Sequence, residues 1–137
     1  HLADLSGLPR HRGRGGDVVE PRRRLAREHR AAVATRMACE REARAVASAA
    51  IEAGHDRAID PDLRVFLYLP FEHSENPADQ ERAVALIAPL GPELLSYAEA
   101  HRDIIRRFGR FPHRNAILGR ETTPEEQRFL DEGGFAG

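Results

Sequence analysis

The chain has 137 residues, enough for one domain with its own hydrophobic core, and a formal net charge of −1. No apolar run approaches the roughly 20 residues that cross a bilayer, and no signal peptide is recognisable, so we expect a soluble, cytoplasmic protein without a membrane segment. The single cysteine, Cys39, excludes an internal disulfide and a cysteine-based zinc site.

Basic and acidic residues are unevenly distributed along the chain. Residues 1–44 carry eleven arginines against six acidic residues, whereas residues 45–137 carry ten against sixteen. The arginine-rich stretches at 10–16 and 22–24 have no helical or alternating period and no aromatic side chains on which bases could stack, which disfavours nucleic-acid binding. Residues 25–42 have a helix-forming composition but a thin apolar stripe. We therefore expect an arginine-rich arm over residues 1–42, either disordered or aberrant.

The sequence changes character at Ala43. Ala45, Ala49 and Ala53 predict a helical face of small residues that ends at Gly54. Asp60-Pro61 then indicates a capped helix start. Periodicity alone cannot decide whether the apolar run from Leu63 to Leu69 is a buried helix or a buried strand. The Asp-Pro start favours a helix, which ends or kinks at Pro70.

Two further helices follow with short connections. Asn76-Pro77 predicts the first start, and the core stripe of that helix is Val84, Ile87 and Leu90. Gly91-Pro92 separates it from a second helix that ends at Gly109. The apolar face of this second helix recurs at spacings of three and four, over Leu94, Ala98, His101, Ile105 and Phe108.

The last part of the chain reads as a loop over 110–121 and a short final helix. Thr123 and Glu126 have the spacing of a capping box at its start. The predicted fold is therefore all-α, with stacked antiparallel helical hairpins over residues 43–137. Four aromatic side chains are expected in its core, namely Phe66, Tyr68, Phe108 and Phe111.

Several short sequence motifs in this region are similar to those of a known family. They are Gly54-His55-Asp56, Phe66 to Glu75, Gln80-Glu81-Arg82, His101 to Asn115, Leu118-Gly119-Arg120 and Thr123-Pro124-Glu125-Glu126. Because of these motifs, residues 43–137 resemble the bacterial domain of unknown function 924 family. The resemblance implies a fold similar to tetratricopeptide-repeat helical hairpins, and no established activity.

The chain also departs from this family. Members normally carry an upstream helical portion with tryptophans and a Leu-Asp-Gln-Phe-Pro-Arg-Asn-like motif, whereas this chain has no tryptophan. We therefore interpret residues 1–42 as a truncated, diverged or frame-shifted segment.

Two stretches, 68–75 and 101–115, are dense in residue types that perform chemistry. The candidate catalytic residues are Glu72, His73, His101 and His113. The candidate ligand-binding residues are Arg106, Arg107, Arg110, Arg114 and Asn115. His101 lies on the apolar stripe of its helix and is expected to point inward. A metal held by these histidines with Glu72 or Glu75 would suit zinc, manganese or iron, but no two histidines here are three or four residues apart, so no metal site is predicted.

Two interpretations of this cluster remain open from the residues. Arginine guanidinium groups match carboxylate or phosphate, so the cluster could bind an anion, or hydrolyse one with Glu72 or His73 as general base. Alternatively, Glu72, Glu75, Arg107 and Arg110 form an internal ion-pair network that fixes how the hairpins stack. We expect a helical scaffold with a polar pocket for a protein partner or a small anionic ligand. The alternative function is a hydrolase, possibly metal-dependent, that acts on an anionic substrate. The sequence names no cofactor, and substrate and oligomeric state cannot be read from it.

Overall fold

The computed structural model describes residues 19–134, and within them every regular element is helical. The α-helices are α1 (Val19–Glu52), α2 (Pro61–Glu72), α3 (Pro77–Ile87), α4 (Pro92–Phe108), α5 (Asn115–Leu118) and α6 (Pro124–Asp131). Three 3-10 turns join them, η1 (His55–Ala58), η2 (Ala88–Leu90) and η3 (Pro112–Arg114). The predicted all-α class is confirmed. No helix of residues 19–134 is both long and apolar enough to cross a membrane.

Helix α1 differs from the expected arm, because it runs without a break through the predicted boundary at residue 42. The arginine-rich stretch at 10–16 lies outside the described residues. Residues 19–32 are helical with exposed side chains, and ion pairs join Arg24 to Glu28 (2.8 Å) and Arg27 to Glu20 (3.0 Å). Alanine, arginine and glutamate favour helix intrinsically, and an exposed i,i+4 pair such as Arg24 and Glu28 adds about 0.3–0.5 kcal/mol. This helix therefore forms without the apolar stripe that sequence reasoning looked for.

The described part of the chain divides into two units between Ala32 and Val33. The hydrophobic core and the candidate site belong to the second unit. Its part of α1 buries Ala47, with Ile51 partly buried beside it. The predicted small-residue face of Ala45, Ala49 and Ala53 is exposed instead. Alanines occur all round this helix, so their spacing alone could not identify the buried side.

The starts of α2, α3 and α6 are confirmed as predicted. The Asp60 side chain accepts from the Asp62 backbone N–H (2.9 Å). The Asn76 side chain accepts from the Ala78 N–H (2.8 Å). Thr123 begins α6 with a complete capping box. Short-range signals of this kind satisfy backbone N–H groups that a helix start leaves unpaired, which is why the sequence alone locates them.

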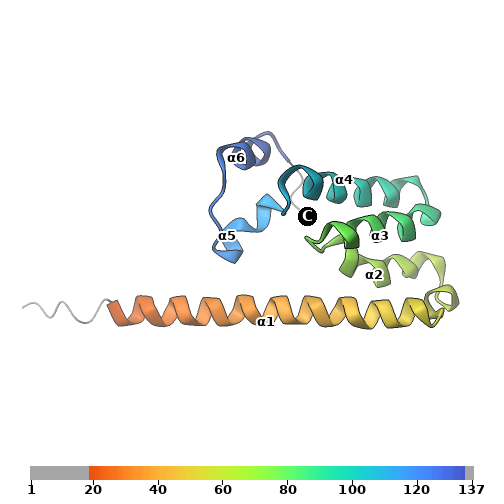
Figure 1. Cartoon of the computed structure of the whole chain (residues 1–137), viewed down its shortest axis with the longest axis horizontal. Helices are drawn as coiled ribbons and strands as arrows, with labels where there is room; N and C mark the ends of the chain where they lie inside the picture. Colours follow the sequence, from red (N-terminus) through yellow and green to blue (C-terminus); the bar gives the residue numbers. More distant parts are fainter. Residues whose placement is uncertain (1–18, 135–137) are drawn as a thin grey trace, which may run out of the picture. The chain divides into compact units, whose positions relative to one another are not determined.

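The main core lies where α2, α3 and α4 pack side by side, with α3 between the other two (Figure 1). Its fully buried members are Ala47, Tyr68, Phe71, Ala83, Ile87 and Ala98. The predicted stripe of α3 is confirmed, since Ile87 is buried and Val84 and Leu90 pack against the same cluster. Helix α2 continues past Pro70 to Glu72, two residues beyond the expected end.

A smaller core fixes the chain after α4. Ile104, Ile105 and Phe111 are buried there, and Phe108 and Phe129 pack against them. The segment 110–121, expected to be a loop, contains η3 and α5. Because Phe111 is anchored in this cluster, the residues around it are held at the C-terminal half of α4, which is what places the candidate site.

Candidate functional site

Four of the nine predicted site residues line one cavity of about 320 Å³, here called the histidine cavity. Its lining residues come from α1, α2, α4 and the η3–α5 segment, and are Arg36, His73, His101, Phe111, His113, Arg114 and Ile117. The cavity therefore combines three imidazoles with two guanidinium groups. His101 is buried, as its place on the apolar stripe of α4 predicted.

Glu72 lies behind His101, at the end of α2. Its Oε1 is 3.0 Å from His101 Nδ1, and both side chains are buried. The same Nδ1 is 2.7 Å from the backbone oxygen of Tyr97, one helical turn earlier in α4. A carbonyl oxygen can only accept a hydrogen bond, so Nδ1 carries the proton and donates it. Glu72 and Tyr97 thus hold the imidazole in one orientation and one tautomer.

The other two histidines pack against ring side chains around the cavity in tilted arrangements. The ring centroids of His73 and His101 are 5.6 Å apart, and those of Phe111 and His113 are 5.7 Å apart. Burial lowers the pKa of both His73 and His113 below the ordinary histidine value. Nδ1 of His113 is buried and has no hydrogen-bond partner among residues 19–134.

The two arginines of the cavity share one carboxylate. Arg36 Nε is 3.3 Å from Glu40 Oε1, and Arg114 Nη1 is 3.8 Å from Glu40 Oε2. The Arg114 guanidinium also lies over the Phe111 ring, 5.1 Å from its centroid. Arg36 and Arg114 therefore converge on the same carboxylate group, Glu40, from α1 and from η3. Sequence reasoning missed Arg36 because it lies in the segment that was set apart as an arm.

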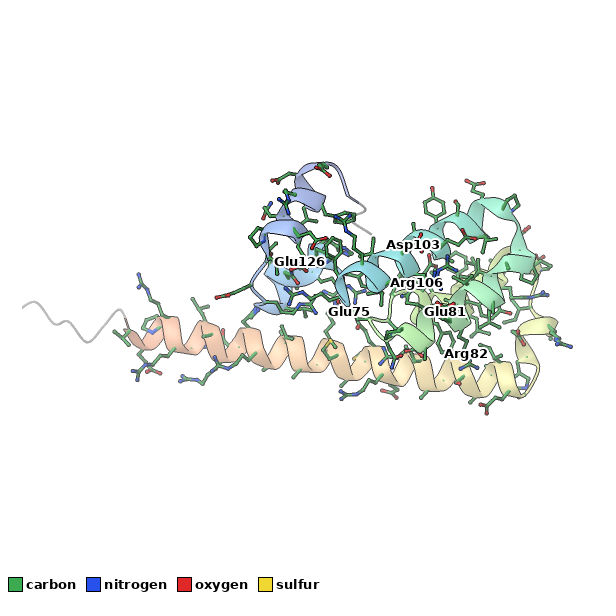
Figure 2. All side chains as sticks on the ribbon, turned by 45° about the horizontal axis from the view of Figure 1, so that its top comes forward. Glu75, Glu81, Arg82, Asp103, Arg106 and Glu126 are labelled. Carbon is green, nitrogen blue, oxygen red and sulfur yellow. The ribbon has the colours of Figure 1, made fainter. Side chains whose placement is uncertain are left out.

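The other predicted ligand-binding residues lie outside the histidine cavity. Arg106 pairs with Glu81 (2.6 Å; both are labelled in Figure 2). Arg107 pairs with Glu125 (3.2 Å), and the side chains of both pairs are about half exposed. Asn115 is completely buried. Its amide nitrogen donates to Thr122 and Glu126, and its amide oxygen accepts from Arg120. These contacts make Asn115 a structural residue that holds α5 against the start of α6.

The internal ion-pair network exists with partners different from those expected. Glu75 accepts two hydrogen bonds from Arg120 (2.7 and 3.1 Å) and one from the Phe111 backbone N–H (2.6 Å). Burial opposes the ionisation of Glu75, but these bonds outweigh it and lower the pKa of its carboxyl group. The network therefore links α2 to the segment around α5.

A second pair joins the end of α4 to α6. Arg110 binds both carboxylate oxygens of Glu126 (2.9 and 2.7 Å), and this pairing lowers the pKa of Glu126 to about 2. Figure 2 labels Glu75 and Glu126, the two carboxylates on which this part of the fold depends. Neither Arg120 nor Glu126 was named for the network, because the partners are 45 and 16 residues apart in sequence.

The structure does not assemble the metal ligands that the histidines and glutamates suggested. Within residues 19–134 no three His, Cys, Asp or Glu side chains lie close enough together to hold a metal ion. Glu72 contacts His101, whereas Glu75 contacts Arg120.

The comparisons with known proteins identify the family. The family described as "Bacterial protein of unknown function (DUF924)" matches residues 22–134. The chain belongs to this family. The resemblance predicted from the sequence is thereby confirmed. The match starts at residue 22 rather than 43, so Arg36, which lines the cavity, and its partner Glu40 lie within the matched residues.

One solved structure is similar to this chain, a protein of unknown function from Agrobacterium tumefaciens. It is 60% identical in sequence with a TM-score of 0.67, and the match covers 69% of this chain and 53% of that one. The chain thus spans about half the length of that relative. No curated protein matches the chain.

Proposed function

We propose that this domain binds a small anionic ligand in the histidine cavity. The observation that carries the proposal is the meeting of Arg36 and Arg114 at one cavity, where both contact Glu40. Guanidinium groups present planar pairs of donors that match carboxylate and phosphate oxygens. The half-buried imidazole of His113 lines the same cavity.

The chemistry of the cavity suits an anion better than a cation. Its charged lining residues are Arg36 and Arg114, and Glu40, their shared counter-ion, lines the adjoining hollow. The Arg114 side chain is 14% exposed, so water screens it little and a second anionic partner would gain from it. An incoming carboxylate or phosphate would compete with Glu40, whose 3.8 Å contact to Arg114 is too long for a strong hydrogen bond.

The test is the binding of inorganic phosphate and acetate to Arg114→Gln and to a control, Arg106→Gln. Arg106 is an exposed arginine outside the cavity, paired with Glu81. A hydrogen bond to a charged group contributes about 1.5–3 kcal/mol, so Arg114→Gln should weaken binding by at least about tenfold in calorimetry. Arg106→Gln should bind like the wild type. Equal affinities of the two variants would refute the proposal.

A second candidate function is hydrolysis, which the contact between Glu72 and His101 favours. A buried carboxylate that fixes the Nδ1–H tautomer of a histidine is the arrangement that prepares an imidazole to act as a general base. In this role His101 would take a proton from water as the water oxygen attacks an ester of the bound anion, and the leaving alcohol would take up that proton. Glu72 would act as a positioning residue.

Substitution of His101 separates hydrolysis from binding alone. A general base contributes about 10²–10⁴-fold to a rate, so His101→Gln should abolish ester hydrolysis while Arg114-dependent anion binding persists. Glu72→Gln should lower the rate less than His101→Gln and shift its pH profile, because the imidazole loses its carboxylate partner. Carboxylic and phosphoric esters of a chromogenic alcohol are the substrates to assay. A rate that is the same with and without His101 would exclude this candidate.

A further inference from the structure

The histidine cavity continues into two adjoining hollows along α1. The second hollow, of about 340 Å³, shares Arg36, His73 and Arg114 with the histidine cavity. The third, of about 420 Å³, shares Ala43, Phe66 and Pro70 with the second. Together they form what we call the α1–α2 groove, which follows α1 from Arg36 to Val46. Ten residues of helix at about 1.5 Å each make this distance about 15 Å.

The character of the groove changes from charged to apolar along this path. The first end carries Arg36, Arg114 and the histidines. The far end is lined by Ala43, Val46, Ala47, Phe66, Leu67 and Pro70, together with Cys39 and Glu42. Between them Glu40 and Arg44 line the groove, and both are paired, Glu40 with Arg36 and Arg44 with Asp79 (3.5 Å).

The apolar end leaves large side chains open to water. Phe66 is 64% exposed and Val46 is 63% exposed, although the sequence placed Phe66 in the core. Phe66 borders both the second and the third hollow. Adjacent exposed apolar residues beside a concave surface are typical of a binding site and would gain from being covered.

We propose that the ligand of this groove is a single-chain amphiphile, a fatty carboxylate whose head binds Arg36 and Arg114 and whose alkyl chain lies against Val46 and Phe66. This inference rests on the proposed anion-binding function and names the class of anion. A peptide with a free carboxylate would fit less well. Its backbone N–H and C=O groups would lose water against side chains such as Ala43 and Leu67 that offer no hydrogen bond, whereas an alkyl chain has no such groups.

The chain length of the ligand provides the test. Acetate, hexanoate and decanoate, together with the neutral decan-1-ol, should be titrated calorimetrically into the full chain below the concentrations at which they self-associate. A fully buried methylene is worth about fourfold in affinity, and in this half-open groove we expect about twofold each. Decanoate should therefore bind about sixteenfold more tightly than hexanoate, and at least tenfold more tightly than decan-1-ol.

Two variants and a matched control test which part of the ligand each end of the groove binds. Phe66→Ser should reduce the gain with chain length while acetate still binds. Arg114→Gln should remove the preference for decanoate over decan-1-ol. Leu63→Ser is the matched control, because Leu63 is an exposed α2 residue (57%) outside the groove, and it should behave as the wild type. Thermal melts followed by circular dichroism show whether each variant is folded.

The outcomes separate this inference from the proposed function. Acetate and phosphate binding that depends on Arg114, with no gain from hexanoate to decanoate, would overturn the amphiphile and leave anion binding intact. Equal affinity for decanoate and decan-1-ol would likewise overturn it, since the head would then play no part. If neither the acids nor phosphate bind, both proposals fail.

Discussion

At the scale of single residues, the candidate cluster contains two kinds of charged side chain. Arg106 and Arg107 form ion pairs that are about half exposed, and such pairs are worth about 0–1 kcal/mol. Arg110 and Arg120 bind buried or half-buried carboxylates through two hydrogen bonds each. An Arg107 substitution would therefore say little about the internal network, although the sequence made it a natural residue to test.

The pair of Arg110 and Glu126 predicts a specific pH dependence of stability. The pKa of Glu126 falls from the ordinary 4.5 to about 2, chiefly through Arg110, so the folded state favours the ionised carboxylate. This contribution is complete above about pH 4.5 and is lost as the pH falls towards 2. We expect Glu126→Gln to lower the free energy of unfolding at pH 7 by about 3 kcal/mol, as when a buried ion pair loses one partner.

Denaturant titrations from pH 7 to pH 2 check this prediction. The wild type should lose stability on acidification more steeply than Glu126→Gln, whose side chain cannot ionise. The control is Glu125→Gln, because Glu125 is a half-exposed neighbour on the same helix turn. Parallel profiles for the wild type and Glu126→Gln would show that this carboxylate does not stabilise the fold.

At the scale of helices, the starts were predictable because they depend on residues three or four positions apart. Asp60, Asn76 and Thr123 all cap the helices expected of them. Helix α1 was not predicted over residues 19–42, because its exposed residues show no amphipathic period. Ion pairs within the helix, such as Arg24 with Glu28, stabilise it without contacting a core. The sequence signal for α1 was composition alone, which also fits a disordered arm.

The capping box of α6 gives a prediction at this scale. Thr123 Oγ1 accepts from the Glu126 N–H (3.1 Å), and Glu126 Oε1 accepts from the Thr123 N–H (3.0 Å). Thr123→Ala removes the first of these bonds and should cost about 1 kcal/mol of stability. Ser96→Ala is a suitable comparison, because Ser96 is an exposed residue within α4 and should change stability by less than about 0.5 kcal/mol. A Thr123→Ala protein as stable as Ser96→Ala in thermal or denaturant unfolding would contradict this assignment.

At the scale of the whole molecule, the all-α class and the inward direction of His101 followed from periodicity. The assembly of the site did not. Glu75 meets Arg120 across 45 residues, and Arg114 meets Glu40 on a helix that the sequence assigned to another segment. Such pairings depend on how helices pack, and one sequence carries no signal for them. The same limitation explains why Phe66, apolar and within an apolar run, was wrongly placed in the core.

The sequence and the structure place the start of the folded unit at different residues. The sequence places this boundary at residue 43, whereas the second compact unit starts at Val33 and includes Arg36 and Glu40. Because every described side chain of residues 19–32 is exposed, a chain of residues 33–137 should melt within a few degrees of the full chain and keep its anion affinity. A chain of residues 43–137 lacks Arg36 and Glu40 and should lose that affinity at least about tenfold. Melting curves and phosphate titrations of the two shortened chains make the comparison, with the full chain as reference. Phosphate affinity preserved in residues 43–137 would remove α1 from the site and return the boundary to where the sequence placed it.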